Sequence, residues 1–261
     1  MNLNKEGILK HLLNPERFDV SVFDTVDSTN NLLKEIAKDK GTEGTVIIAD
    51  SQTGGRGRYD RKFYSPKGTG IYMSILLKPS LKAHDSVLIT AAASVAVNEA
   101  VEKCCGKQTG IKWVNDLFLN GKKVCGILTE GSLSIETGGF NWAVLGIGIN
   151  VYEPDNQFDK EIKDIAGAIE KEKQSDLRNK LCAEIINRFF YYYENLENRE
   201  FLDSYRKHSV VLGEEITVIK NENNLKATAL SIDNDCRLLV RYENGEEEYL
   251  SSGEISIKIK A

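Results

Sequence analysis

A glycine- and arginine-rich stretch, residues 52–66, has the residue types that bind phosphate groups. Glycine lets the backbone adopt positive φ and approach a ligand closely, and arginine and lysine add positive charge. The stretch contains three glycines and four basic residues, Gly54, Gly55, Gly57, Arg56, Arg58, Arg61 and Lys62. Because glycines lose much entropy on ordering and the like charges are relieved only by Asp60, we expect this loop to be mobile until an anion binds. An arginine-rich surface loop, or an RNA-binding segment, is the alternative for the stretch taken alone.

A second group of reactive side chains surrounds the dipeptide Asn120-Gly121. Between two β-rich runs this dipeptide predicts a hairpin with a two-residue type I′ turn. The register then pairs Phe118 with Lys123 and makes Asp116 a same-face diagonal neighbour of Lys123, about 7–8 Å away at the backbone. The turn thus places an acid and an amine on one surface. An ordinary cross-strand ion pair, worth about 0–1 kcal/mol, is the alternative.

Polar side chains also gather where a short strand, 20–23, gives way to a helix that stops at Gly41. Asp27-Ser-Thr-Asn30 supplies capping oxygens there, and the apolar residues that follow lie at helical spacing. The free backbone N–H groups of the first turn, together with these side chains, form a suitable site for a small polar head group. Plain helix capping is the alternative.

The remaining elements position these groups. The strand 45–49 leads directly into the glycine/arginine loop, which therefore starts from a rigid support. In the strand 141–151, Gly146 and Gly148 indicate that a ligand or another backbone comes close, or that packing requires small residues there. The pattern predicts a further strand at 71–77 and helices within 1–17 (ending at Asn14-Pro15), from 85 or 86 to 101, from 176 to 196 and around 201–205.

From Leu212 the chain consists of short β runs joined by tight turns, which predicts a small barrel or sandwich. The expected boundary near Leu212-Gly213 divides the chain into a main domain, 1–211, and a C-terminal domain, 212–261. The five β runs are 215–219, 225–232, 237–242, 246–250 and 255–259, with turns at 233–235 and 244–245.

The composition sets outer limits on function. The 261 residues are 41% apolar with a net charge of −5, which argues against a surface that grips nucleic acid as a whole. Five cysteines with no C-x-x-C spacing indicate neither a disulfide framework nor a zinc knuckle. The N-terminus does not have the order of a signal peptide, and no apolar run reaches membrane-spanning length. We therefore expect a cytoplasmic protein with no membrane contact.

Three motifs follow one another along the chain. They are Gly55-Arg-Gly-Arg58 with Arg61 and Ser65-Pro66; Lys112-Trp-x-Asn-Asp116 with Lys123 and Gly126-Ile-Leu128; and Gly146-x-Gly-Ile-Asn150. In this order and spacing they closely resemble biotin protein ligases, and the resemblance extends from about Phe23 to Gly253-Glu-Ile-Ser256. It implies an α+β fold: a mixed β-sheet flanked by helices, related to class II aminoacyl-tRNA synthetases, with a small C-terminal SH3-like β-barrel.

The resemblance also implies roles for individual residues. Biotin would be held by Ser28, Thr29, Asn30, Gln52, Gly55, Arg56, Gly57, Arg58 and Lys123. The nucleotide would be held by Arg58, Arg61, Phe63, Asn115, Lys123 and Asn150, with Phe63 stacking on adenine. The catalytic residues would be Arg58, Lys123 and Asp116. Asp116 would act either on the incoming lysine or on a magnesium ion, and the metal ligands themselves are not assigned.

The activity implied by the resemblance is ATP-dependent ligation. Biotin would be activated as biotinyl-5′-AMP, with Mg²⁺ as cofactor, and then transferred to a lysine of a biotin carboxyl carrier protein domain. Fixed positive charge and magnesium suit this chemistry, because negative charge builds up where the biotin carboxylate meets the α-phosphate. The family also implies a homodimer formed through a sheet edge. With no room for a winged helix before Phe23, we expect no sequence-specific DNA binding.

Three residues depart from the family pattern. Val114 stands where proline is frequent, Asp60 where glycine is frequent, and Phe63 where tryptophan is frequent. Asp60 adds negative charge to a phosphate loop, and Phe63 offers a smaller stacking surface. Two other functions stay open: a lipoate or octanoate ligase or transferase of the same superfamily, and a non-catalytic regulator that binds biotin or nucleotide.

Overall fold

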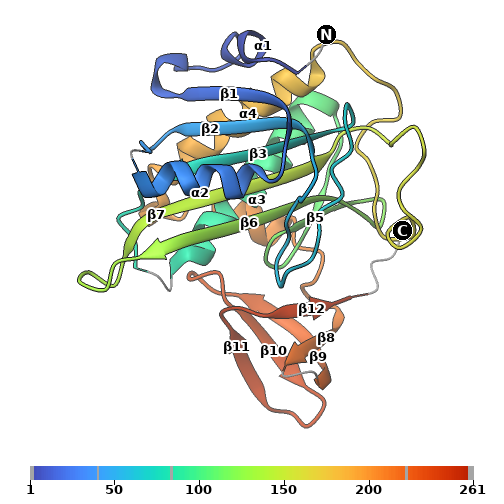
Figure 1. The fold of residues 1–261 in the computed structure, drawn as a ribbon. Helices are drawn as coiled ribbons and strands as arrows, with labels where there is room; N and C mark the ends of the chain where they lie inside the picture. Colours follow the sequence, from blue (N-terminus) through green and yellow to red (C-terminus); the bar gives the residue numbers. More distant parts are fainter. Residues whose placement is uncertain (1–2, 40, 83–84, 221–222, 258–261) are drawn as a thin grey trace.

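The computed structural model describes residues 3–39, 41–82, 85–220 and 223–257. A large mixed sheet with helices on both faces forms the main part, and a small β domain lies beside it, below the sheet in Figure 1. This confirms the α+β architecture expected from the order of strands and helices.

The main sheet has seven strands in the order β1-β2-β3-β7-β6-β5-β4. β1 and β2 run parallel, and every other neighbouring pair is antiparallel. The strands are β1 Asp19–Val26, β2 Thr45–Gln52, β3 Gly70–Leu77, β4 Gly110–Lys112, β5 Asp116–Leu119, β6 Lys122–Leu133 and β7 Phe140–Asn150. β1 and β4 are the two edges of the sheet, and the expected homodimer through a sheet edge stays a prediction.

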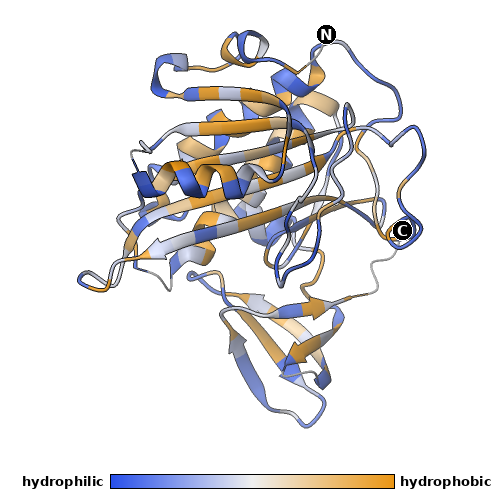
Figure 2. Cartoon of the chain, in the orientation of Figure 1, coloured by the Kyte–Doolittle hydropathy of each residue, from blue (hydrophilic) through white to orange (hydrophobic). Residues whose placement is uncertain are grey.

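Two long helices, α3 (Ser86–Cys105) and α4 (Leu177–Tyr193), cover one face of the sheet. The alanines of α3 are fully buried, and their small side chains let the helix lie close to the strands. The amphipathic helix α2 (Thr29–Asp39) lies on the opposite face, over β2, β3 and β7. Figure 2 shows hydrophobic residues concentrated on the central strands and both kinds of residue along α2. Since α2 covers only part of this face of the sheet, the strands β5 and β6 are left open to a ligand.

The N-terminal helix is shorter than predicted. It ends at Leu9 (α1, Lys5–Leu9), and Leu13, which was expected on its apolar side, is 78% exposed. Asn187 of α4 provides the physical reason: its side-chain oxygen accepts from the Leu13 N–H at 3.0 Å and its amide donates to the His11 carbonyl at 3.1 Å. The first bond takes the Leu13 N–H, which a continued helix would have bonded to the Leu9 carbonyl. The second bond satisfies the His11 carbonyl, which would have had no helical partner because Pro15 lacks an N–H. A short 3₁₀ turn, Pro15–Arg17, follows.

Two details of the C-terminal helices also differ from expectation. Asp176 precedes α4, but its side chain does not cap the helix; its carboxylate accepts from Asn179 Nδ2 at 2.9 Å and lies 2.8 Å from His11 Nε2. Leu196, expected on the same helical stripe, lies in a separate 3₁₀ turn, Leu196–Asn198. The second helix, α5 (Phe201–Lys207), is confirmed.

The small domain is one antiparallel sheet of five strands in the order β11-β10-β9-β8-β12. The strands are β8 Glu215–Lys220, β9 Asn223–Ile232, β10 Leu238–Tyr242, β11 Glu247–Leu250 and β12 Glu254–Ser256. The last predicted strand, 255–259, starts as expected, and its residues 258–259 lie outside the described residues. The boundary at 211/212 stays a prediction. Within the described part of the chain, no helix is long and apolar enough to cross a membrane.

Candidate active site

A cavity of about 530 Å³ opens beside α2, on the part of that face of the sheet that the helix leaves uncovered. It extends from the N-terminus of α2, across β7, β6, β5 and β4, to β12 of the C-terminal domain. It brings together thirteen of the fourteen site residues that the resemblance implies. They are Ser28, Thr29, Asn30, Gln52, Arg56, Gly57, Arg58, Arg61, Phe63, Asn115, Asp116, Lys123 and Asn150. The exception is Gly55, which does not line the cavity. A Cβ atom there would lie 2.4 Å from the Phe63 carbonyl oxygen, so Gly55 allows the two arms of the loop to pack together.

At the α2 end of the cavity, buried polar side chains form a continuous chain of hydrogen bonds. Thr29 donates from its backbone N–H and its hydroxyl to Gln52 Oε1, at 2.9 and 3.1 Å, and Gln52 Nε2 donates to Ser65 Oγ at 2.9 Å. Ser74 Oγ lies 2.6 Å from Asn30 Oδ1 and 2.8 Å from Thr29 Oγ1. Because each group is held by the next, this end presents fixed donors and acceptors to a neutral polar ligand.

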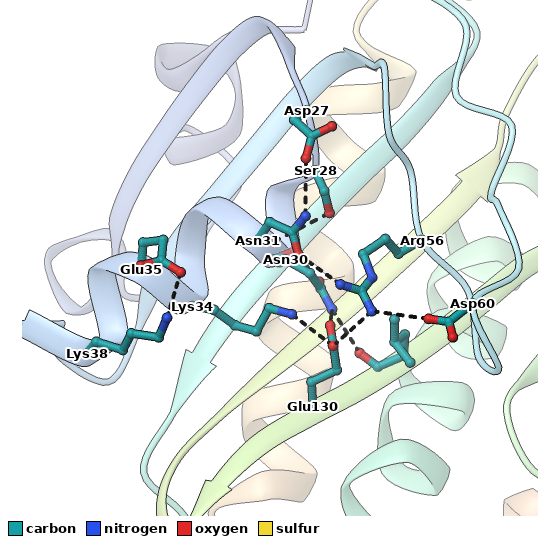
Figure 3. A network of polar contacts seen from close by, with 12 residues as sticks. Asp27, Ser28, Asn30, Asn31, Lys34, Glu35, Lys38, Arg56, Asp60 and Glu130 are labelled. Carbon is teal, nitrogen blue, oxygen red and sulfur yellow. Dashed lines mark hydrogen bonds and ion pairs between the residues drawn. The ribbon is translucent and has the colours of Figure 1, made fainter.

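Glu130 on β6 is the centre of a second polar network, which Figure 3 shows. Its carboxylate accepts from Asn30 Nδ2 and from Lys34 Nζ, both at 2.9 Å, and lies 3.7 Å from the Arg56 guanidinium. Burial raises the pKa of Glu130, but the hydrogen bonds from Asn30 and Lys34 outweigh it and leave the pKa below its usual value. Arg56 also donates to Asn31 Oδ1 at 3.2 Å, so this arginine ties the glycine/arginine loop to α2. The sequence pattern gave no indication of Glu130.

The two glycines of β7 lie under two side chains that the resemblance assigned to different ligands. A Cβ atom on Gly146 would lie 2.2 Å from Asn30 Oδ1, and one on Gly148 would lie 2.7 Å from the Phe63 ring. The structure therefore supports the alternative that packing requires small residues here, because the groups that come close are side chains and not another backbone. The approach of a ligand stays a prediction. Since the two positions share one face of the strand, they set Asn30 and Phe63 side by side on the floor of the cavity.

The hairpin at Asn120-Gly121 has the predicted register around its turn, with Phe118 opposite Lys123. A bulge between Leu117 and Phe118 shifts the pairing beyond that point. Both turn residues have positive φ, 51° and 74°, as a type I′ turn requires.

This hairpin forms the charged part of the cavity. Lys123 Nζ lies 2.6 Å from Asp116 Oδ1, which confirms that the turn brings the acid and the amine together. Asn115 Nδ2 donates to the same carboxylate oxygen at 3.1 Å and to the Ile127 carbonyl at 3.0 Å. Arg58 from the glycine/arginine loop donates to Asn115 Oδ1 at 3.0 Å. An amine, a guanidinium and a carboxylate thus lie within reach of one bound anion.

The C-terminal domain contacts the glycine/arginine loop directly. Arg58 donates to the Gly253 carbonyl at 2.9 Å, and Arg61 lies 2.6 Å from Glu254 Oε1 at the start of β12. Trp113 Nε1 donates to the Cys236 carbonyl at 2.9 Å, which fixes the turn between β4 and β5 to the same domain. Sequence reasoning missed Glu254 as a member of the site. The expected mobility of the loop before an anion binds stays a prediction.

The structure places the three residues that depart from the family pattern. Asp60 has φ of 57°, where glycine is ordinarily favoured, and its side chain is 99% exposed, 3.9 Å from Arg56. Its carboxylate therefore does not line the cavity. The Trp113–Val114 peptide bond is cis, and Tyr205 donates to the Val114 carbonyl at 3.1 Å.

Metal ligands are sparse in this site. Among the residues that the structure describes, no group of three or more histidine, cysteine, aspartate or glutamate side chains is arranged to hold a metal ion. The carboxylates that line the cavity are Asp116, Asp164 and Glu254.

The fold and the site together define a sheet protein whose cavity has fixed polar groups at one end and a group of cations at the other. Comparison with known proteins agrees. Residues 22–150 match the model of the biotin/lipoate A/B protein ligase family, and residues 211–258 match the biotin protein ligase C-terminal domain. Together these matches cover more than half of the chain. The chain belongs to this family, and its small domain is the SH3-like C-terminal domain of the biotin protein ligases.

Individual relatives support the same assignment. The bifunctional ligase/repressor BirA of Bacillus subtilis is 42% identical over 146 residues, which is 56% of this chain and 44% of that protein. The chain thus matches less than half the length of that relative. The biotin–[acetyl-CoA-carboxylase] ligase of Mycobacterium tuberculosis is 26% identical over 242 residues, 87% of this chain and 85% of that protein. The biotin protein ligase of Aquifex aeolicus, solved in complex with biotin and ATP, superposes with a TM-score of 0.73 at 27% identity, over 91% of this chain and 97% of that one.

Proposed function

We propose that this chain activates biotin with ATP to form biotinyl-5′-AMP, and then transfers the biotinyl group to a lysine of a biotin carboxyl carrier protein domain. One observation carries the proposal: a single cavity joins the fixed polar groups around Asn30 and Gln52 to the cations Arg58 and Lys123 around Asp116. The first set suits the neutral ring of biotin. The second set suits the carboxylate of biotin and the phosphates of ATP.

In the first half-reaction a carboxylate oxygen of biotin attacks the α-phosphorus of ATP, and the bond from that phosphorus to the leaving pyrophosphate breaks. Two anions must meet for this to happen, so fixed positive charge is needed where they approach. Lys123 and Arg58 supply it from β6 and from the loop. The polar end of the cavity contributes by holding the ring, which keeps the carboxylate close to the phosphate.

In the second half-reaction the neutral amine of the acceptor lysine attacks the carbonyl carbon of the anhydride, and AMP leaves with the bonding electron pair. The amine must lose a proton as the new amide forms. Asp116, on the cavity wall, is the carboxylate placed to orient the amine and accept that proton. Its contact with Lys123, 2.6 Å from Asp116 Oδ1, fixes the carboxylate in position on the wall of the cavity.

Magnesium is expected to enter together with ATP. Its preferred ligands are oxygens, and the phosphates with bound water supply most of them. Asp116, Asp164 and Glu254 are the carboxylates that line the cavity, and their oxygens fit a hard cation. Bound magnesium would neutralise phosphate charge during adenylate formation.

The glycine/arginine loop would serve as a lid over the adenylate. A mixed anhydride hydrolyses when water reaches it, so a covering loop protects the intermediate. Arg56 and Arg58 anchor the loop on opposite sides of the cavity, to Asn31 and to Asn115.

A substrate competition assay tests the proposed function. The purified chain is given ATP, magnesium, a carrier domain and equal concentrations of biotin and lipoate, and the modified carrier is identified by mass spectrometry. We expect biotinylated carrier and an ATP requirement. Preferential attachment of lipoate would favour the other acyl-ligase activity of the superfamily, and binding of biotin without modification of the carrier would favour a non-catalytic regulator.

A further inference from the structure

Lys112 lies on the wall of the same cavity, at the end of β4, and no role has yet been given to it. It is directly opposite Asp116 in the β4–β5 ladder, so both side chains share the face that carries Lys123. The ammonium lies 6.0 Å from the centre of the Phe118 ring, at the outer limit of a cation–π contact. The side chain is half-buried.

The ammonium of Lys112 differs from the neighbouring cations in its partners. Arg58 donates to Asn115 and Gly253, Arg61 contacts Glu254, and Lys123 contacts Asp116. Across the described residues, no hydrogen bond or ion pair within 4 Å engages Lys112 Nζ. A half-buried charge without such a partner is unfavourable in the empty protein, because the group loses contact with water and gains no hydrogen bond or close ion pair in exchange.

The electrostatics around Lys112 agree with that geometry. Desolvation lowers the pKa of Lys112, and nearby Lys123 and Arg61 lower it further, while Asp116 and Glu254 oppose them. Six cationic side chains, Arg56, Arg58, Arg61, Lys62, Lys112 and Lys123, line the cavity against three carboxylates, Asp116, Asp164 and Glu254. The excess of positive charge fits a ligand with several negative charges.

The order of the strands shows where Lys112 lies relative to the polar end of the cavity. Asn30 lies over β7, Lys123 is on β6, Asp116 on β5 and Lys112 on β4. Neighbouring strands are about 4.8 Å apart, so Lys112 lies roughly 14 Å across the sheet from the polar end of the cavity. In phosphoryl and adenylyl transfer, the attacking and leaving oxygens lie on opposite sides of the phosphorus. A carboxylate that arrives from the β7 side therefore drives the leaving group toward β4.

We propose that Lys112 binds the β- and γ-phosphates of ATP and the pyrophosphate that leaves. This role rests on the proposed adenylation, and it gives different cations of the cavity different parts of ATP to bind. Lys123 and Arg58 act at the α-phosphate, and Lys112 holds the leaving group on the far side. Lys112 has no part in the second half-reaction, because pyrophosphate has gone by then.

The test compares Lys112→Met with a matched control, Lys122→Met. Methionine keeps the length of the side chain and removes the charge. Lys122 is a lysine of the same sheet, but it is exposed and does not line the cavity. Four quantities are measured for each protein: the KM for ATP, the KM for biotin, the rate of transfer from supplied biotinyl-5′-AMP to a carrier domain, and the Tm. Binding of inorganic pyrophosphate to the full chain is measured by calorimetry, which requires no catalysis.

For Lys112→Met we expect the KM for ATP and the Kd for pyrophosphate to rise about tenfold to a hundredfold, as for the loss of one charge-assisted hydrogen bond. The KM for biotin and the transfer from supplied adenylate should stay at the wild-type values. The Tm should not fall, because a desolvated charge is replaced by an apolar group. Lys112→Arg should recover most of the ATP affinity, and Lys122→Met should behave as wild type throughout.

Wild-type ATP and pyrophosphate affinities in Lys112→Met would overturn the assignment. So would a combined loss of Tm, biotin affinity and transfer rate, since that pattern marks a structural role. If the unaltered chain makes no biotinyl-5′-AMP, the proposed function fails instead. The pyrophosphate titration would then still show whether Lys112 belongs to an anion site.

Discussion

Replacing Gly146 with alanine should weaken biotin binding selectively. The new Cβ would lie 2.2 Å from Asn30 Oδ1, far inside the distance that real Cβ contacts reach. The backbone cannot retreat, because Gly146 is paired with Ser74 on β3 and with Leu128 on β6 in the middle of the sheet. Asn30 must therefore move, and it loses its bonds to Ser74 Oγ at 2.6 Å and to Glu130 at 2.9 Å.

The size of the effect follows from those bonds. A buried polar group that loses its partner costs about 1–3 kcal/mol. At about 1.4 kcal/mol for each factor of ten, the KM for biotin should rise about 5- to 150-fold. The KM for ATP should change little, because the cations proposed to bind the phosphates lie on β4, on β6 and in the glycine/arginine loop.

Gly148→Ala is the matched control, two residues along the same strand and on the same face. Its Cβ would lie 2.7 Å from the Phe63 ring, so the ring must turn or shift. Loss of an aromatic stacking contact, about 0.5–1.5 kcal/mol, should raise the KM for ATP about 2- to 12-fold and leave the KM for biotin near wild type.

Steady-state kinetics of adenylate formation, with each substrate varied in turn, measures both constants, and circular dichroism checks that both variants fold. The reasoning fails if Gly146→Ala raises the KM for ATP instead of that for biotin. It also fails if the two alanine variants cannot be told apart.

Two further predictions concern the charged residues. Arg58→Ala and Lys123→Ala should each slow pyrophosphate release in the first half-reaction about 10²- to 10³-fold, as for a lost donor to developing charge, with the fold intact; wild-type rates in both would show that the site is assigned wrongly. Because the pKa of Glu130 is lowered in the folded protein, its contribution to stability is present above the usual glutamate pKa of about 4.3 and is lost as the pH falls through the folded value. Glu130→Gln should therefore flatten the acid limb of a plot of Tm against pH between about 6 and 3, and an unchanged acid limb would contradict the role of the bonds from Asn30 and Lys34.

Local patterns predicted the parts of the site that depend on short-range geometry. The Asn120-Gly121 turn set the pairing of Phe118 with Lys123, because two residues with positive φ leave few alternatives for the strands on either side. Asp116 contacts Lys123 beyond a bulge that the pattern did not predict. The polar residues at 28–30 were placed at the start of α2 by the spacing of the apolar residues that follow them.

Contacts between distant segments could not be found in this way. Glu130 is 100 positions from Asn30, and Gly253 is 195 positions from Arg58. No periodicity links such residues, because the order of strands in the sheet and the docking of the small domain bring them together. The early end of α1 also involves a contact of this kind, since Asn187 of α4 accepts from the Leu13 N–H that would have continued that helix.

The structure changes the effect expected from aspartate at position 60, where the family frequently has glycine. In the sequence Asp60 adds negative charge to a loop predicted to bind phosphate. In the folded chain the carboxylate is almost fully exposed and does not line the cavity. Its remaining effect on the loop is through the backbone, where φ of 57° favours glycine.

The most direct test of the central claim is the intact mass of a biotin carboxyl carrier protein domain after incubation with the purified chain, biotin, ATP and magnesium. The account predicts the gain of a single biotinyl group on one lysine, dependent on ATP and preceded by biotinyl-5′-AMP that can be isolated when the carrier is left out. A carrier of unchanged mass, from a folded chain that binds both biotin and ATP, would contradict it.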